Sequence, residues 1–154
     1  LDALDPDGVL VSNGPGDPEL LDDRLPLIRD LATDLPTFGI CLGHQLISEA
    51  AGARTYKMKF GHHGVNHPVR DEQTGRVFVT SQNHGFAVEE ESLPANVTVW
   101  LKNANDGSIE GIRLSDIPVM SAQFHPEASP GPRDARWIFD DFMELVRSGS
   151  AKSS

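Results

Sequence analysis

The chain has 154 residues, of which 38% are hydrophobic and 23% charged, so it is long enough for one domain with a sizeable core. That composition excludes a disordered tail, and no apolar run approaches the roughly 20 residues that cross a bilayer. Thirteen basic and 23 acidic side chains give a formal charge of −10, which argues against nucleic acid and membrane partners. The single cysteine, Cys41, excludes an internal disulfide and a multi-cysteine zinc site, and it favours a reducing, cytoplasmic setting.

The first elements predicted along the chain are a strand and a helix. Gly8–Val11 is an apolar run that ends at a dense Ser-Asn-Gly-Pro-Gly turn signal, which predicts a buried strand entering a loop. Apolar residues then recur at helical spacing over 21–31, with Asp22 or Asp23 as the expected cap and Pro26 tolerated only in the first turn.

A second strand and a second helix follow. Pro36–Ile40 predicts a buried strand, and Leu42–Ala51 has a helical pattern that ends at Gly52. Strands alternating with helices predict an α/β fold, in which a mainly parallel sheet is flanked by crossover helices.

The second half of the chain changes character. Short, partly alternating runs separated by turn clusters predict antiparallel hairpins; these runs are 69–71, 76–80, 97–102, 108–113 and 119–124. A last helix is expected just after Pro132, burying Ile138, Phe139, Phe142 and Leu145 or Val146. Residues 148–154 are rich in serine and are expected to form a flexible tail.

Cys41 lies between two glycines, Gly39 and Gly43, where the second strand turns into the second helix. This spacing is typical of a nucleophile on a sharp turn, where the next backbone N–H is free to stabilise an oxyanion. The start of the helix also favours the thiolate. Taken alone, the pattern fits a buried core cysteine about equally well.

His125 is the best-placed base among the six histidines, because it ends a strand-like run and precedes Pro126 and Glu127. Pro126 favours extended backbone at His125, so the His125 and Glu127 side chains can lie on one face. A carboxylate there would hold one ring nitrogen and leave the other for the thiol. Taken alone, the same triplet fits a surface loop.

Two further motifs are weaker. The loop Asn13–Gly16 follows the first strand and could supply a second oxyanion donor or an anion nest, but it lacks the pattern of a nucleotide-binding loop. His62, His63 and His67 suggest a metal site, but the neighbouring sequence offers no carboxylate or thiol and indicates an irregular loop. We therefore predict no metal site.

Four segments together resemble the class I, triad-type glutamine amidotransferase family: Ser12–Pro18, Phe38–Gln45, Ser81–Phe86 and Gln123–Ala128. Lys57–Pro68 and His125–Pro132 resemble in particular the glutaminase domain of the carbamoyl-phosphate synthase small subunit. The match runs from about Asp7 to Val146. The resemblance implies a flavodoxin-like α/β fold.

The resemblance also implies roles for individual residues. Cys41 would be the nucleophile, His125 the general base and acid, and Glu127 the orienting carboxylate. The backbone N–H groups of Leu42 and Gly14 would form the oxyanion hole. Contacts to glutamine would come from the set Gly14, Gly16, Gln45, Asn83, Gly85 and Phe86.

The resemblance implies hydrolysis of L-glutamine through a cysteinyl thioester, with ammonia passing to the carbamoyl-phosphate synthase large subunit. That subunit would use ATP, Mg and bicarbonate, so no cofactor is expected in this chain, and the product would feed pyrimidine and arginine synthesis. The alternatives are a glutaminase of another amidotransferase, of the anthranilate or GMP type, and an inactive fragment with a structural or regulatory role. Because the family has a strand and helix ahead of Asp7, residues 1–147 are expected to be an N-terminally truncated domain that lacks its first strand.

Overall fold

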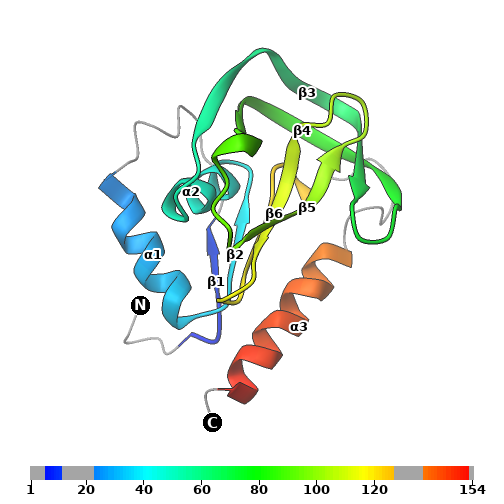
Figure 1. The fold of residues 1–154 in the computed structure, drawn as a ribbon. Helices are drawn as coiled ribbons and strands as arrows, with labels where there is room; N and C mark the ends of the chain where they lie inside the picture. Colours follow the sequence, from blue (N-terminus) through cyan, green and yellow to red (C-terminus); the bar gives the residue numbers. More distant parts are fainter. Residues whose placement is uncertain (1–5, 12–22, 127–136, 153–154) are drawn as a thin grey trace.

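The structure is a computed structural model that describes residues 6–11, 23–126 and 137–152, with side chains described up to residue 148. Over these ranges the elements in chain order are β1 (Val9–Val11), α1 (Leu25–Asp34), β2 (Thr37–Ile40), α2 (Leu42–Ala50), β3 (Thr55–Asp71), β4 (Val77–Val88), the short 3₁₀ helix η3 (Glu90–Ser92), β5 (Val97–Asn103), β6 (Ile109–Leu114), β7 (Val119–Ala122) and α3 (Trp137–Lys152). The predicted α/β class is confirmed (Figure 1).

The strands of the described residues form one seven-stranded sheet in the order β1-β2-β7-β6-β5-β3-β4. Only β1, β2 and β7 pair in parallel, and all other neighbours in this order are antiparallel. The described sheet is therefore mixed rather than mainly parallel, because the predicted hairpins extend the same sheet instead of standing apart from it.

Helix α1 shows how far local signals determine an element boundary. It begins at Leu25 with Pro26 in its first turn, as predicted. Proline is tolerated there because the backbone N–H that it lacks would have no intrahelical acceptor in the first turn. The N-cap residue is Arg24, and no side chain caps the helix, so Asp23 does not play the expected role. Asp22 and Leu21 lie outside the described residues.

Strands β3 and β4 form a hairpin much longer than the two short strands predicted there. His62 pairs with His84, and His63 pairs with Asn83, so the histidine segment expected to be an irregular loop is part of a strand. The register shifts between Lys57 and His62 and again between Gly64 and His67. These bulges break the period-two pattern by which a strand is recognised in a sequence.

Helices cover both faces of the sheet (Figure 1). On one face α1 and α2 enclose a core that includes Ile28, Leu46, Ile47, Ile112 and Val119. On the other face α3 packs over a core that includes Phe38, Trp100, Leu101, Phe124 and Ile138.

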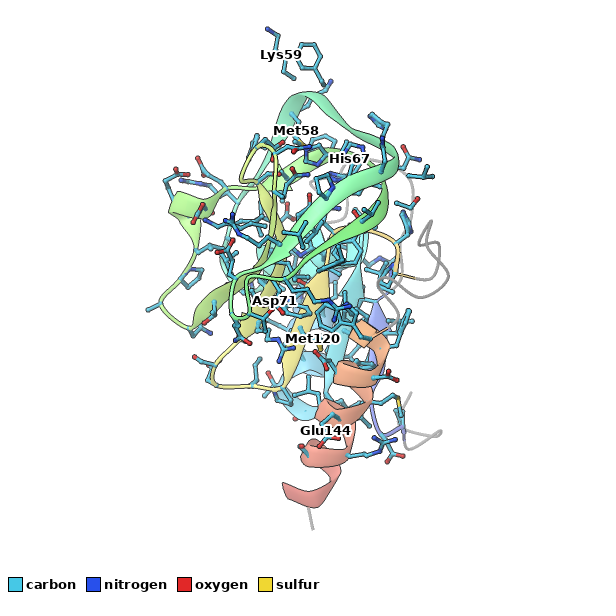
Figure 2. All side chains as sticks on the ribbon, turned by 90° about the vertical axis from the view of Figure 1, so that its right-hand side faces the viewer. Met58, Lys59, His67, Asp71, Met120 and Glu144 are labelled. Atoms are coloured by element: carbon cyan, nitrogen blue, oxygen red, sulfur yellow. The ribbon has the colours of Figure 1, made fainter. Side chains whose placement is uncertain are left out.

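The predicted inner face of α3 is confirmed. Ile138 is fully buried, Val146 is buried, and Phe139, Phe142 and Leu145 pack against the core. The helix continues to Lys152, into the segment expected to be a flexible tail. Figure 2 shows Glu144 on this helix at one end of the molecule and Lys59 on the β3–β4 hairpin at the other. Over the residues described, no helix combines the length and the apolar character that crossing a membrane requires.

Candidate active site

Cys41 lies between β2 and α2 in a backbone conformation that disfavours every residue except glycine. Its φ is 56° and its ψ is −109°, and it is the only non-glycine residue with positive φ in the described part of the chain. Such a conformation costs on the order of 1–3 kcal/mol, and it persists only where the surrounding fold enforces it. Residues held in this way are concentrated at functional sites.

The glycines on either side of Cys41 are required by close packing. A Cβ on Gly39 would lie 2.5 Å from Ile47 Cδ1 and 2.6 Å from the Gly43 carbonyl oxygen. A Cβ on Gly43 would overlap the carbonyl oxygen of Val11 at the end of β1. The bracketing glycines therefore let β1, β2 and α2 meet closely around the thiol.

Sheet register brings the predicted catalytic segments to one edge. Ile40 of β2 pairs with Ala122 of β7, and the Cys41 N–H donates to the Ala122 carbonyl at 2.9 Å. Because these strands are parallel, the chain after Ala122 leaves the sheet beside Cys41. It reaches His125, which is half-buried and whose backbone N–H donates to the Ser81 carbonyl at 3.0 Å.

Three residues of the predicted site lie outside the described residues: Gly14, Gly16 and the orienting carboxylate Glu127. Their roles remain predictions. Leu42 is the first residue of α2, where backbone N–H groups have no intrahelical acceptor. This is the position from which the family resemblance implies an oxyanion donor.

The thiol of Cys41 is buried against two polar groups. Its Sγ lies 3.9 Å from the Asn83 carbonyl oxygen, which can accept the thiol proton. The amide Nε2 of Gln123 donates to Sγ at 3.8 Å. An N–H donor aimed at sulfur stabilises the thiolate, and a carbonyl acceptor stabilises the thiol, so both forms have a partner.

Gln45 joins α2 to β4 and to the segment after β7. Its backbone N–H donates to the Cys41 carbonyl at 3.2 Å, which places it one helical turn from the thiol, as predicted. Its side-chain Nε2 donates at 3.0 Å both to the Phe86 carbonyl and to Gln123 Oε1. The fold thus brings Cys41, Gln45, Asn83 and Phe86 together.

Gln123 belongs to this group although no role was predicted for it from the sequence. It is fully buried and bonds both Gln45 and the thiol. It lies directly after the end of β7 at Ala122 and two residues before His125, within the Gln123–Ala128 segment that carries the family resemblance. Gly85, in contrast, faces open space, with no atom within 4 Å of an added Cβ.

His44 and His84 are both buried and held neutral. Burial, with a smaller contribution from His84, lowers the pKa of His44 to about 3. His44 Nδ1 bonds Ser121 Oγ at 2.6 Å. Burial also lowers the pKa of His84 to about 4, against the opposing effect of the Phe86 carbonyl.

Of the three histidines considered for a metal site, only His62 belongs to a group of converging ligand atoms among the described residues. Its partners are His84 and Glu110, which lie 22 and 48 positions further along the chain. Burial raises the pKa of Glu110 to about 8. His63 instead faces the Asn83 side chain, at 2.8 Å from its Oδ1.

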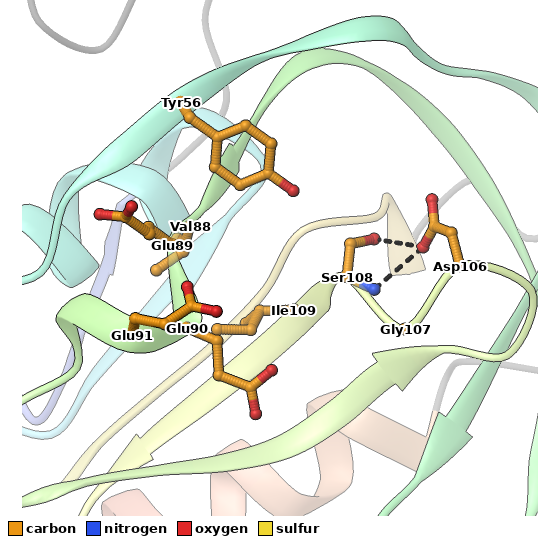
Figure 3. Close-up of a pocket in the computed structure, with 9 residues that line it drawn as sticks. All are labelled: Tyr56, Val88, Glu89, Glu90, Glu91, Asp106, Gly107, Ser108 and Ile109. Atoms are coloured by element: carbon orange, nitrogen blue, oxygen red, sulfur yellow. Dashed lines mark hydrogen bonds between the residues drawn. The ribbon is translucent and has the colours of Figure 1, made fainter.

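A separate pocket of about 440 Å³ lies beside this group and contains none of the predicted site residues. Its walls include Tyr56, the acidic residues 89–91 and Asp106 (Figure 3). One carboxylate oxygen of Asp106 accepts from both the backbone N–H and the hydroxyl of Ser108, at 2.9 and 2.7 Å.

Sequence comparison identifies close relatives of this chain. A carbamoyl phosphate synthase small chain from Xanthomonas axonopodis pv. citri (strain 306) is 60% identical over 145 residues, which cover 94% of this chain and 37% of that relative. A protein of the same description from Salmonella typhimurium (strain LT2) is 57% identical over 144 residues, covering 93% and 38%. The chain therefore spans less than two fifths of the length of these relatives.

Solved structures share the fold. A protein from Thermoplasma acidophilum, described as a putative subunit of GMP synthase, matches with a TM-score of 0.81 and 24% identity, covering 99% of this chain and 79% of that one. A glutamine amidotransferase from Thermotoga maritima matches with a TM-score of 0.63 and 24% identity, covering 90% and 64%. The family profile described as glutamine amidotransferase class-I matches residues 1–145. This chain belongs to the class I glutamine amidotransferase family.

Proposed function

We propose that this chain hydrolyses L-glutamine to glutamate and ammonia, with Cys41 as the nucleophile. The observation that carries the proposal is the strained turn at Cys41, with Gln123, Asn83 and the start of α2 around the thiol. A sulfur nucleophile beside the N–H groups of a helix start is the arrangement that acyl transfer requires. The relatives named carbamoyl phosphate synthase small chain support the same chemistry.

In the proposed reaction the Cys41 thiolate attacks the side-chain carboxamide carbon of glutamine. The backbone N–H groups of Leu42 and Gly14 stabilise the resulting oxyanion. His125, oriented by Glu127, donates a proton to the nitrogen as the C–N bond breaks, and ammonia leaves. Water that gives its proton to His125 then attacks the thioester, which releases glutamate and restores the thiol.

The binding side of the proposal uses Gly16, Gln45, Asn83, Gly85 and Phe86 to hold glutamine. Gln45 is suited to this role because Phe86 and Gln123 fix its side chain. A held amide orients a polar substrate at little further loss of conformational freedom.

We further propose that the ammonia passes to a carbamoyl-phosphate synthase large subunit, the partner implied by the names of the relatives. ATP, Mg and bicarbonate would bind to that subunit, so the glutaminase step needs no cofactor on this chain. The carbamoyl phosphate would feed pyrimidine and arginine synthesis. A cytoplasmic setting, which keeps Cys41 reduced, completes the proposal.

The test is ammonia release from glutamine by the chain, measured alone and together with the large subunit of a carbamoyl-phosphate synthase. In a second assay, a glutamine analogue with an electrophilic ketone carbon should label the unsubstituted protein, called the parent below, at Cys41. Cys41→Ser keeps the size of the side chain but replaces the thiol with a far less acidic hydroxyl, so it should fold normally. We expect it to lose at least about 1,000-fold in rate.

Three results separate the alternatives. Folded parent protein that neither hydrolyses glutamine nor takes up the label, even with the large subunit, would point to an inactive structural role. Ammonia release that survives Cys41→Ser would show a different nucleophile. Activation by a GMP-type or anthranilate-type synthase, but not by the carbamoyl-phosphate synthase subunit, would assign the same chemistry to another pathway.

A further inference from the structure

Three buried side chains from three strands converge at a place separate from the Cys41 thiol. His62 of β3, His84 of β4 and Glu110 of β6 are each buried, with exposed fractions of 6%, 7% and 0%. His62 Nδ1 lies 3.2 Å from His84 Nε2 and 3.5 Å from Glu110 Oε1. One ligand atom from each residue lies within 4.8 Å of the others.

Hydrogen bonds on the outer side of the cluster determine which ring nitrogens carry protons. His84 Nδ1 lies 2.8 Å from the Phe86 carbonyl oxygen, which can only accept, so Nδ1 is the protonated nitrogen. His62 Nε2 lies 2.7 Å from a carboxylate oxygen of Asp106 and donates to it. The other nitrogen of each ring, His62 Nδ1 and His84 Nε2, faces the centre of the cluster.

Gln82 adds a fourth acceptor at the same place. The Thr80 hydroxyl donates to the His67 carbonyl at 2.7 Å, so its lone pair accepts from Gln82 Nε2 at 3.0 Å. That contact fixes the orientation of the amide and leaves Gln82 Oε1 facing His84 Nε2 at 2.8 Å. Two acceptors at this distance repel each other unless a positive charge lies between them.

Glu110 completes the set. Its Oε1 accepts from Asn103 at 3.2 Å, while its Oε2 is buried with no hydrogen-bond partner among the described residues. A carboxylate without a full set of donors is costly to bury. Four acceptor atoms face one another here, from His62, His84, Gln82 and Glu110. One added proton could bridge only two of them, whereas a divalent cation can be bound by all four.

The spacing around His62 Nδ1 suits a tetrahedral metal ion, whereas the 2.8 Å from Gln82 Oε1 to His84 Nε2 would have to lengthen for Gln82 to take the fourth position. Zinc–nitrogen and zinc–oxygen bonds of about 2.0–2.2 Å place neighbouring ligand atoms roughly 3.3–3.5 Å apart in a tetrahedral site. The separations of 3.2 and 3.5 Å around His62 Nδ1 match this value. Two imidazoles and one carboxylate form a ligand set typical of zinc.

The surroundings provide support and access. Asp106 holds His62 through its outer nitrogen, and Ser108 holds the other oxygen of Asp106, which is the carboxylate–histidine arrangement that orients metal ligands. Asp106 also lines the acidic pocket beside residues 89–91, with its side chain 46% exposed (Figure 3). Glu89 pairs with Arg54 and Glu90 pairs with Lys102, so the charges of Glu91 and Asp106 are the ones that raise the local concentration of cations at this entrance.

We propose that His62, His84 and Glu110 bind a divalent zinc ion, with Gln82 Oε1 facing the fourth position. The ion would link β3, β4 and β6 across the hairpin that the bulges weaken. It would also fix His84, whose partner carbonyl on Phe86 is the one that accepts from Gln45. The site is separate from the glutaminase chemistry, and it replaces the expectation of no metal site.

The test uses the full chain treated with a chelator and then titrated with zinc or cobalt. We expect one zinc per chain by elemental analysis and a rise in melting temperature. The visible absorption of bound cobalt should indicate tetrahedral geometry without a thiolate charge-transfer band. His84→Gln and Glu110→Gln should abolish stoichiometric binding. Asp106→Asn, a change at the pocket wall, should weaken zinc affinity about 10–100-fold while leaving the fold intact.

His63→Gln is the matched control, because His63 is an exposed histidine next to His62 and should retain parental affinity. Cys41→Ser should also retain it. Absence of near-stoichiometric zinc in the parent would overturn the proposal. So would zinc that is lost with Cys41→Ser, or parental affinity in Asp106→Asn. Each readout is independent of glutamine hydrolysis, so an inactive chain that binds zinc would contradict only the proposed function.

Discussion

Acidification should destabilise this protein through His44. The ring is fully buried, and its pKa is lowered from 6.5 to about 3. In the unfolded chain His44 takes up a proton below pH 6.5, whereas in the folded chain it stays neutral until near pH 3. The stabilising effect is therefore complete above pH 6.5 and is lost as the pH falls from 6.5 toward 3.

The size of the effect follows from the two pKa values. Their full difference corresponds to about 5 kcal/mol, at about 1.4 kcal/mol for each pH unit. Between pH 7 and pH 5 only the unfolded form titrates appreciably, and the free energy of unfolding should fall by about 2 kcal/mol through His44 alone. Urea unfolding at pH 5, 6 and 7 measures this loss.

His44→Asn isolates the contribution. An amide at this position can still bond Ser121 but does not titrate, so the variant should lose about 2 kcal/mol less than the parent between pH 7 and pH 5. His63→Asn, which removes an exposed histidine, is the matched control for the substitution itself. Parallel curves for the parent and His44→Asn, within about 0.5 kcal/mol, would refute the assignment of His44 as a buried neutral ring.

Three further variants test the packing and the site. Gly43→Ala should lower the free energy of unfolding by about 1–3 kcal/mol or more, because its Cβ would overlap a carbonyl oxygen of β1. Gly85→Ala is the control and should change the free energy of unfolding by under about 0.5 kcal/mol. Equal effects of the two variants in urea unfolding would contradict the packing argument. Ile138→Ala should lower it by about 2–5 kcal/mol by leaving a cavity under α3, with the half-exposed Met143→Ala as control; a loss below about 1 kcal/mol would mean that α3 is loosely packed. Gln123→Ala should lower kcat/KM for glutamine by roughly 10-fold or more, through the lost bonds to the thiol and the amide beside it, and an unchanged rate of ammonia release would exclude a role.

The sequence was most informative where local pattern and packing agree. The apolar runs at β2 and α2 predicted both elements within about one residue, because burial of one strand and one helical face leaves a clear periodicity. The two glycines also predicted a sharp turn between them that would expose the Cys41 thiol; the turn is present, but the thiol is buried against Asn83 and Gln123. The structure accounts for those glycines by the close approach of β1 and α2.

The hairpin of β3 and β4 could not be predicted in the same way. Its polar residues, glycines and two bulges hide the alternation of a strand, and its pairing depends on residues about 20 positions apart. The His62–His84–Glu110 cluster depends on that register and on β6 as well. No local spacing in the sequence reveals it, because His62 is adjacent in sequence to His63 and near His67, whereas the residues that converge on it are His84 and Glu110.

With Cys41 as the proposed nucleophile, selection for catalysis and selection for stability favour different residues at position 41. Glycine adopts a φ of 56° with a ψ of −109° at little cost, whereas cysteine pays roughly 1–3 kcal/mol for it. In a lineage that no longer uses the thiol, a substitution of Cys41 by glycine would therefore stabilise the protein and would be favoured. A descendant with glycine at position 41 would be a sign of lost chemistry in an intact fold.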